Sequence, residues 1–154
     1  MQHLSFHAAM TLTEWSKSTL RRRLAEGVIR CADSSQAGGS KQTLICFGSI
    51  QHDICLPLEP EDIELLEQAD AGETSAQTDL AALFLEYDKF KSAIYWLELA
   101  AKQQFADAMH LLGGCYLAGK GVIKDDHLAL MWIAKAASLG HVLAQMQMQA
   151  LMAR

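Results

Sequence analysis

Residues 106–144, ADAMHLLGGCYLAGKGVIKDDHLALMWIAKAASLGHVLA, decide the fold because an earlier stretch repeats their pattern. Residues 76–108, AQTDLAALFLEYDKFKSAIYWLELAAKQQFADA, align with them at an offset of 32 residues and then, after an extra loop, of 36 residues. Apolar residues recur at spacings of three and four in both stretches, which is typical of amphipathic helices. The chain therefore contains a repeated pair of helices, the pattern of an α-solenoid.

The same register continues on both sides of these two copies. It predicts helices at 61–70, 75–86, 89–102, 107–118, 125–139 and 142–153, which form a half repeat, two full repeats and a closing helix. Alanines at 100–101 and 136–137 let neighbouring helices approach closely, while Trp96 and Trp132 fill the space between layers. Gly140 suits a helix end, where a positive φ is often needed.

A specific set of residues in the second copy matches a known motif. The set is Ala108, Leu112, Gly113, Tyr116, Gly119, Gly121, Val122, Asp125, Ala129, Trp132, Ala136, Ala137, Gly140, His141 and Ala144. It resembles the Sel-one-like repeat family, a branch of the tetratricopeptide-like solenoids. The first copy lacks the glycine loop and has Gln104 where the family usually has glycine. The resemblance covers about residues 62–153 and implies a scaffold for protein–protein contacts, without catalysis.

A binding surface is also expected from this arrangement. In solenoids of this kind the first helices of the repeats line a groove. The candidate residues for contact with a protein partner in that groove are Asp79, Leu83, His110 and Cys115.

Charge divides the chain into two parts. Residues 1–55 carry six Lys and Arg against four acidic residues, whereas residues 56–154 carry seven against fourteen. No Lys or Arg occurs between Lys41 and Lys89. The contrast predicts two domains with different partners, at 1–56 and 57–154.

The N-terminal part has its own pattern, LSFHAAMTLTEWSKSTLRRRLAEGVI at 4–29. The predicted elements are a helix at 5–11, a turn at 12–15, a helix at 16–26 and strands at 28–32 and 43–47. Ser16 or Ser18 can cap the second helix. The two apolar strands flank a glycine-bearing loop and so predict a β-hairpin.

This order of elements, with Ser16-Lys17-Ser18-Thr19-Leu20, Arg22 and Glu26-Gly27, resembles the winged-helix domains of the excisionase and MerR-like DNA-binding families. The resemblance implies that the second helix enters the major groove of DNA and that the hairpin touches the phosphate backbone. The DNA contacts that it implies come from Lys17, Ser18, Thr19, Arg21 and Arg22, with Lys41 on the wing. Arginine forks and hydroxyl groups are suited to guanine edges and phosphates. Arg23 departs from the family, which usually has an apolar residue there, and the loop is longer and less basic.

Other constellations favour structural roles. The spacing of Cys31, Cys46, His52 and Cys55 is not a standard zinc pattern. Two glycine-rich stretches lack the spacing of a phosphate-binding loop. No nucleophile and base stand in a recognisable pattern, so we expect no metal, no cofactor and no enzymatic activity.

The expected fold is mostly α: a winged helix-turn-helix with a small β-hairpin, followed by an α/α solenoid of about two and a half repeats. The apolar runs are too short for a membrane span and no signal peptide is recognisable, which predicts a cytoplasmic protein without membrane contact. The leading hypothesis is a DNA-binding regulator of bacterial or phage style, whose repeats bind a protein partner or a second copy. A homodimer fits because such proteins often bind palindromic sites. The alternative is an adaptor that acts through protein contacts alone.

Overall fold

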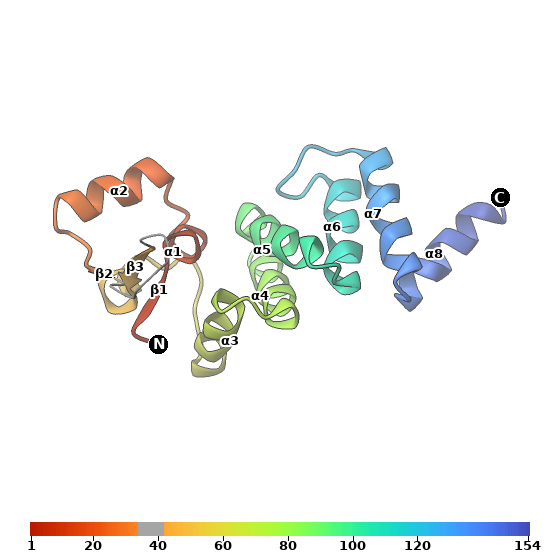
Figure 1. The fold of residues 1–154 in the computed structure, drawn as a ribbon. Coiled ribbons are helices and arrows are strands. Elements are labelled where there is room, and N and C mark those ends of the chain that lie inside the picture. The colour runs from red at the N-terminus through yellow and green to blue at the C-terminus, as the bar shows by residue number, and fades with distance from the viewer. Residues whose placement is uncertain (34–41) are drawn as a thin grey trace. The chain divides into compact units, whose positions relative to one another are not determined.

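The computed structural model describes residues 1–33 and 42–154, and its contacts divide the chain into two compact units, Met1–Ala71 and Gly72–Arg154 (Figure 1). Helices predominate in the described residues, as the sequence predicted. None of the helices in these two stretches is long and apolar enough to cross a membrane.

The first unit opens with a short strand and two helices. Its elements are β1 (His3–Ser5), α1 (Phe6–Thr13), α2 (Lys17–Ala25), β2 (Cys31–Asp33), β3 (Thr43–Cys46), two short 3-10 turns and α3 (Pro60–Asp70). The strands form an antiparallel sheet in the order β1-β3-β2, in which Ile45 is paired with Leu4 on one side and with Cys31 on the other. The two predicted helices and the hairpin strands are confirmed. The sequence prediction missed β1, because three residues are too few to show an alternating pattern.

Serine caps and small apolar residues explain why α1 and α2 form at these positions. The Oγ of Ser5 accepts a hydrogen bond from the Ala8 N–H at 3.2 Å, and the Oγ of Ser16 accepts one from the Thr19 N–H at the same distance. Such caps satisfy backbone donors that the first turn leaves open. The fully buried core of the sheet and its helices consists of Leu4, Ala8, Ala9, Leu12, Leu20, Ile45 and Ile50.

Helix α3 makes its long-range contact with the start of the chain. Pro60 opens the helix, and the Glu59 N–H donates to Asp62 Oδ2 at 2.9 Å. At the other end, Asp70 Oδ2 accepts a hydrogen bond from the Ser5 N–H at 2.7 Å. The contacts thus group α3 with the N-terminal elements, whereas the sequence prediction placed it with the repeats. The domain assignment with a boundary after residue 56 stays a prediction.

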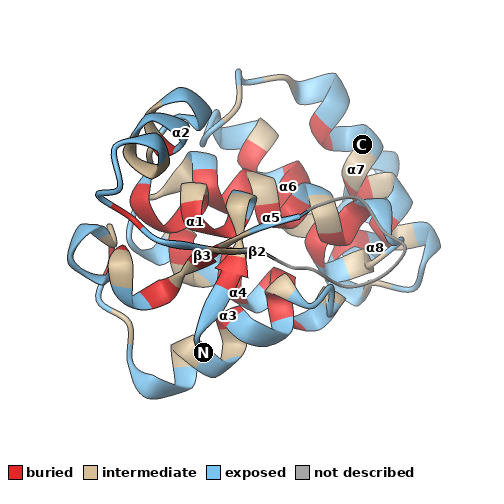
Figure 2. Ribbon diagram, turned by 60° about the vertical axis from the view of Figure 1, so that its left-hand side comes forward, coloured by how far each residue is buried: buried red, intermediate tan, exposed pale blue. Residues whose placement is uncertain are grey.

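The second unit is a row of helices, each packed against the next in the sequence. They are α4 (Thr74–Glu86), α5 (Phe90–Lys102), α6 (Ala106–Ala118), α7 (Asp126–Ser138) and α8 (Val142–Met152), and each begins and ends within one residue of its predicted bounds. Buried residues line the sides on which α5 and α6 face each other (Figure 2). Trp96 is buried in this interior, whereas Trp132 is only half-buried and has the Lys135 ammonium 4.9 Å from its ring centre.

Close backbone approach explains two glycines of the repeat. A Cβ on Gly113 would lie 2.8 Å from Ile133 Cγ1, so the absence of a side chain lets α6 and α7 pack tightly. A Cβ on Gly121, whose φ is +74°, would lie 2.6 Å from the carbonyl oxygen of Phe90. The extra loop of the second copy therefore folds back onto the start of α5, and only glycine fits there.

Candidate protein-binding groove and basic helix

A hollow of about 240 Å³ opens on the repeat unit, over the first helices of successive repeats. Helix α6 supplies most of its lining, including His110, Leu111 and Leu117. Leu85 comes from α4 and Gln147 from α8. The hollow therefore runs across α4, α6 and α8, and we call it the groove.

Two of the four residues predicted for this groove line it. His110 and Cys115 do so, whereas Asp79 is exposed and Leu83 half-buried on α4, outside the described lining. Helix α4 contributes Leu85 instead. The sequence analysis missed Gly114 and Leu117, although their spacing of four and seven residues from His110 places them on the same helical face.

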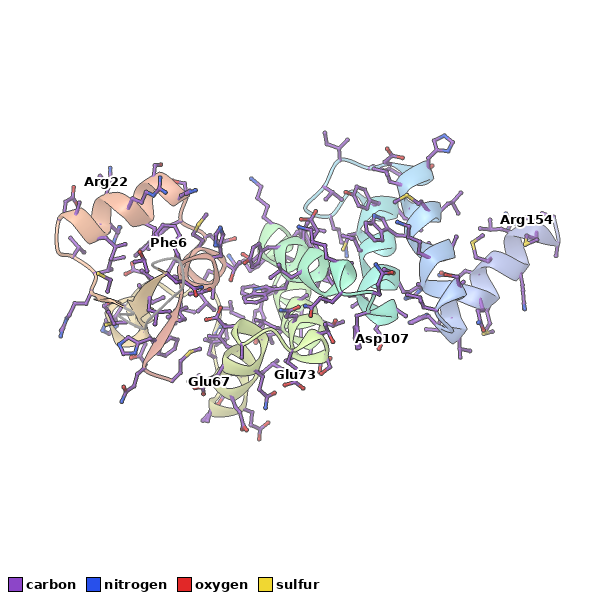
Figure 3. The ribbon with its side chains drawn as sticks, viewed as in Figure 1. Phe6, Arg22, Glu67, Glu73, Asp107 and Arg154 are labelled. Carbon is purple, nitrogen blue, oxygen red and sulfur yellow. The ribbon has the colours of Figure 1, made fainter. Side chains whose placement is uncertain are left out.

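His110 is held in place by contacts with α8 and the turn before it. Its Nε2 lies 3.1 Å from Gln147 Oε1, and its ring stacks on that of His141 with centres 4.3 Å apart. The Nδ1 of His141 accepts a hydrogen bond from the Ala144 N–H at 3.1 Å and so caps α8. Its Nε2 lies 3.5 Å from an oxygen of Asp107, at the start of α6 (Figure 3). One connected cluster thus fixes the groove wall and joins α6 to α8.

Cys115 contributes an uncharged thiol to the groove. Burial raises the pKa of this thiol, while the positive charge of Lys120 opposes the rise. Because only the thiolate is a good nucleophile, the residue acts as a small apolar group at neutral pH. Lys120 itself has its ammonium 5.4 Å from the ring centre of Phe90 and lines the same hollow, where it supplies a positive charge.

Helix α2 presents the predicted DNA-contacting residues. Lys17, Ser18, Arg21 and Arg22 are exposed, and Thr19 is half-buried. Figure 3 shows Arg22 on this helix, where its Nε lies 3.9 Å from Glu26 Oε1. Lys41, the sixth predicted contact, lies outside the described residues.

The hydroxyl of Ser16 bonds to two other hydroxyls at the start of α2. Ser16 Oγ lies 2.9 Å from the hydroxyl oxygens of both Ser18 and Thr19, in addition to capping the helix. Beside them, Lys17 and Arg21 line a second hollow, of about 420 Å³, together with Thr43 of β3. The basic side chains of Lys17 and Arg21 therefore lie beside Thr43, the first residue of β3.

Arg23 departed from the family pattern, and its contact explains how the helix accommodates it. Its guanidinium lies 4.1 Å from the ring centre of Trp15. An arginine stacked on an aromatic face contributes about 0.5–1 kcal/mol at an exposed site. The charged residue thus covers Trp15 in the way that an apolar side chain would.

All four cysteines lie in the part of the chain that the structure describes. Cys31 is exposed, Cys46 and Cys55 are half-buried and Cys115 is buried, and these four residues form no disulfide. Within 1–33 and 42–154, no group of three or more His, Cys, Asp or Glu side chains is placed to hold a metal ion.

Comparisons with known proteins identify the repeats. The Sel1 repeat model matches residues 74–105 and 106–141. A protective antigen of uropathogenic Escherichia coli strains, which displays an SLR fold, is 33% identical with a TM-score of 0.54; the match covers 58% of this chain and 20% of that one. A Sel1 repeat protein from Oxalobacter formigenes is 36% identical with a TM-score of 0.50, over 56% of this chain and 68% of that one. The chain thus spans a fifth of the length of the first protein and about two thirds of the second. With two matched repeats in α4 to α7, and with a Sel1 repeat protein that is 36% identical matched over 68% of its own length, the chain belongs to the Sel1 repeat family.

Proposed function

We propose that this chain is an interaction adaptor that holds a segment of a partner protein in the groove across α4, α6 and α8. The observation that carries the proposal is the groove itself, an open hollow with a fixed wall on a Sel1 repeat unit. Grooves of helical repeats are well suited to extended or helical peptide segments.

The lining indicates what kind of segment fits. Leu85, Leu111 and Leu117 offer apolar contacts, and Lys120 adds a positive charge. His110 presents an imidazole whose position is fixed by Gln147. A segment with two or three apolar side chains and one carboxylate would match this pattern, because apolar burial supplies affinity and the ion pair supplies orientation.

The test uses peptides selected from a random library against the purified protein. Their affinity is then measured by fluorescence anisotropy for the wild type, Leu117→Lys and Leu130→Lys. Leu117 and Leu130 are matched, with 40% and 38% of their surface exposed, but only Leu117 lines the groove. We expect Leu117→Lys to weaken binding at least about tenfold, since it puts a charge into an apolar contact. Equal affinities for the two variants would contradict the proposal.

DNA binding by the first unit is the second candidate function. It is supported by the order strand, helix, turn, helix and hairpin, and by the exposed Lys17, Arg21 and Arg22 on the second helix. The family comparisons support protein contacts and add nothing for DNA, so the adaptor takes precedence over the regulator that the sequence suggested first.

A titration into labelled mixed-sequence duplex DNA at low and at moderate salt distinguishes the two functions. A DNA-binding unit would show affinity that falls steeply with salt, because bound cations release counterions from the phosphates. Replacement of Arg21 and Arg22 by alanine would then abolish binding. The control replaces Lys91 and Lys102, two exposed cations of the second unit, and removes the same charge. No binding at low salt would leave the groove as the functional site.

A further inference from the structure

The hollow of about 420 Å³ beside α2 has walls that come from separate elements of the first unit. One wall is a face of α2. Lys17, Arg21 and Leu24 lie on it together, because residues that are four and seven positions apart project from the same side of a helix. We call this cavity the basic hollow.

The other wall forms where β1 passes into α1. Ser5, the last residue of β1, is paired with Leu44 of β3 in an antiparallel ladder. The residues that follow Ser5 therefore lie beside the residues that precede Leu44. All four of them line the basic hollow: Phe6, His7, Gln42 and Thr43. Strand pairing thus fixes the position of this wall.

The described lining of the basic hollow carries positive charge and no acidic side chain. Lys17 and Arg21 are exposed, and neither forms an ion pair with another described residue. Arg22 differs in both respects, since it lies outside the lining and its Nε is 3.9 Å from Glu26 Oε1. The chain as a whole has a net charge of −5, so its composition does not explain this local excess of cations. Cations that line a concave site attract anions.

Apolar surface lies next to these cations. Phe6 and Leu24 are half-buried and line the basic hollow, one from each wall. A bare inorganic anion would leave both side chains in contact with water, whereas a ligand with a flat apolar group would cover them. Sites for small molecules typically have volumes of about 300–1,000 Å³ and combine apolar lining with a few polar groups. The basic hollow has this size and this combination.

We propose that the basic hollow binds a small phosphate monoester that carries a flat apolar group. Such a phosphate has a charge of about −1.5 to −2 at neutral pH, which matches the two fixed cations, Lys17 and Arg21. The planar guanidinium of Arg21 can donate two parallel hydrogen bonds to phosphate oxygens, and the Thr43 hydroxyl can donate another. The apolar group then lies against Phe6 and Leu24. This site belongs to the first unit and is independent of the protein-binding groove.

A nuclear magnetic resonance titration of the isotope-labelled full chain with phenyl phosphate tests the proposal, because each amide signal reports where the ligand binds. We expect the signals of Lys17, Arg21 and Thr43 to shift to saturation and the signals of the groove to stay unchanged. Inorganic phosphate and phenol represent the two parts of this ligand. Each should bind at least about tenfold more weakly than phenyl phosphate, since each makes only part of the contacts.

Two adjacent arginines provide matched variants. Arg21→Ala and Arg22→Ala each remove one exposed cation from α2, but only Arg21 lines the basic hollow. Arg21→Ala should weaken phenyl phosphate binding by at least about tenfold, because hydrogen bonds between charged groups are the strong ones. Arg22→Ala should leave the affinity nearly unchanged. The amide signals of α1 and of the sheet in each variant establish that the first unit is still folded.

Four outcomes would overturn the proposal. One is the absence of saturable shifts with phenyl phosphate at millimolar concentrations. Another is equal affinity for inorganic phosphate, which would mean that charge alone attracts the ligand. The third is an equal loss of affinity in Arg21→Ala and Arg22→Ala. The fourth is displacement of phenyl phosphate by mixed-sequence duplex DNA with both arginines contributing alike, which would make the hollow part of a nucleic-acid surface.

Discussion

Gly113 and Gly114 are adjacent on α6 and offer a direct test of the close packing that defines the repeat. Replacement of a helical glycine by alanine stabilises a helix by about 0.5–1 kcal/mol, because glycine loses more conformational freedom on folding. A Cβ on Gly114 meets no atom within 4 Å. A Cβ on Gly113 would lie 2.8 Å from Ile133 Cγ1 and 3.1 Å from the Ala129 carbonyl oxygen. Overpacking of this kind costs about 1–3 kcal/mol.

The two substitutions should therefore have opposite effects on stability. Gly114→Ala should raise the free energy of unfolding by about 0.5–1 kcal/mol, while Gly113→Ala should lower it by about 0.5–2 kcal/mol once the clash outweighs the helix gain. Thermal unfolding followed by far-ultraviolet circular dichroism measures both variants against the wild type, at about 4–8 °C of Tm per kcal/mol for a unit of this size. If Gly113→Ala stabilised the protein as much as Gly114→Ala, the close approach of α6 and α7 would be refuted.

Three further predictions follow from single residues. His141→Ala should destabilise α8 by about 1 kcal/mol through loss of its cap, and His141→Asn should restore most of that, as measured by amide hydrogen exchange in α8. Cys115 should resist iodoacetamide at pH 8, where the exposed Cys31 reacts, because burial raises the pKa of the Cys115 thiol and lowers its thiolate fraction. The contribution of this thiol to the stability of the fold should be lost only as the pH rises above the ordinary thiol pKa of 9.0. Gln104→Gly should stabilise the protein by about 1 kcal/mol because Gln104 has a φ of +63°, whereas Gln103→Gly, at a φ of −89°, should not; chemical denaturation distinguishes them.

The sequence by itself determined the helices of the repeats. Their apolar spacing, the small residues between layers and the glycine loop placed α4 to α8 within one residue, because helix periodicity is a local property that sequence displays directly. It also identified α1, α2 and the two hairpin strands. The family followed from the same local residues, since the motif at 108–144 is dense in positions that packing constrains.

Only the tertiary structure decided how the residues on these helices are grouped. Leu85 takes the place in the groove lining that the sequence analysis gave to Leu83, because the face that a helix presents depends on which neighbours cover its other side. Asp70 accepts a hydrogen bond from the backbone of Ser5, 65 residues earlier, and so brings α3 to the N-terminal unit. Arg23 rests on Trp15, and His110 on His141. Each of these contacts joins residues through space, and the periodicity of one segment carries no information on the distance to another.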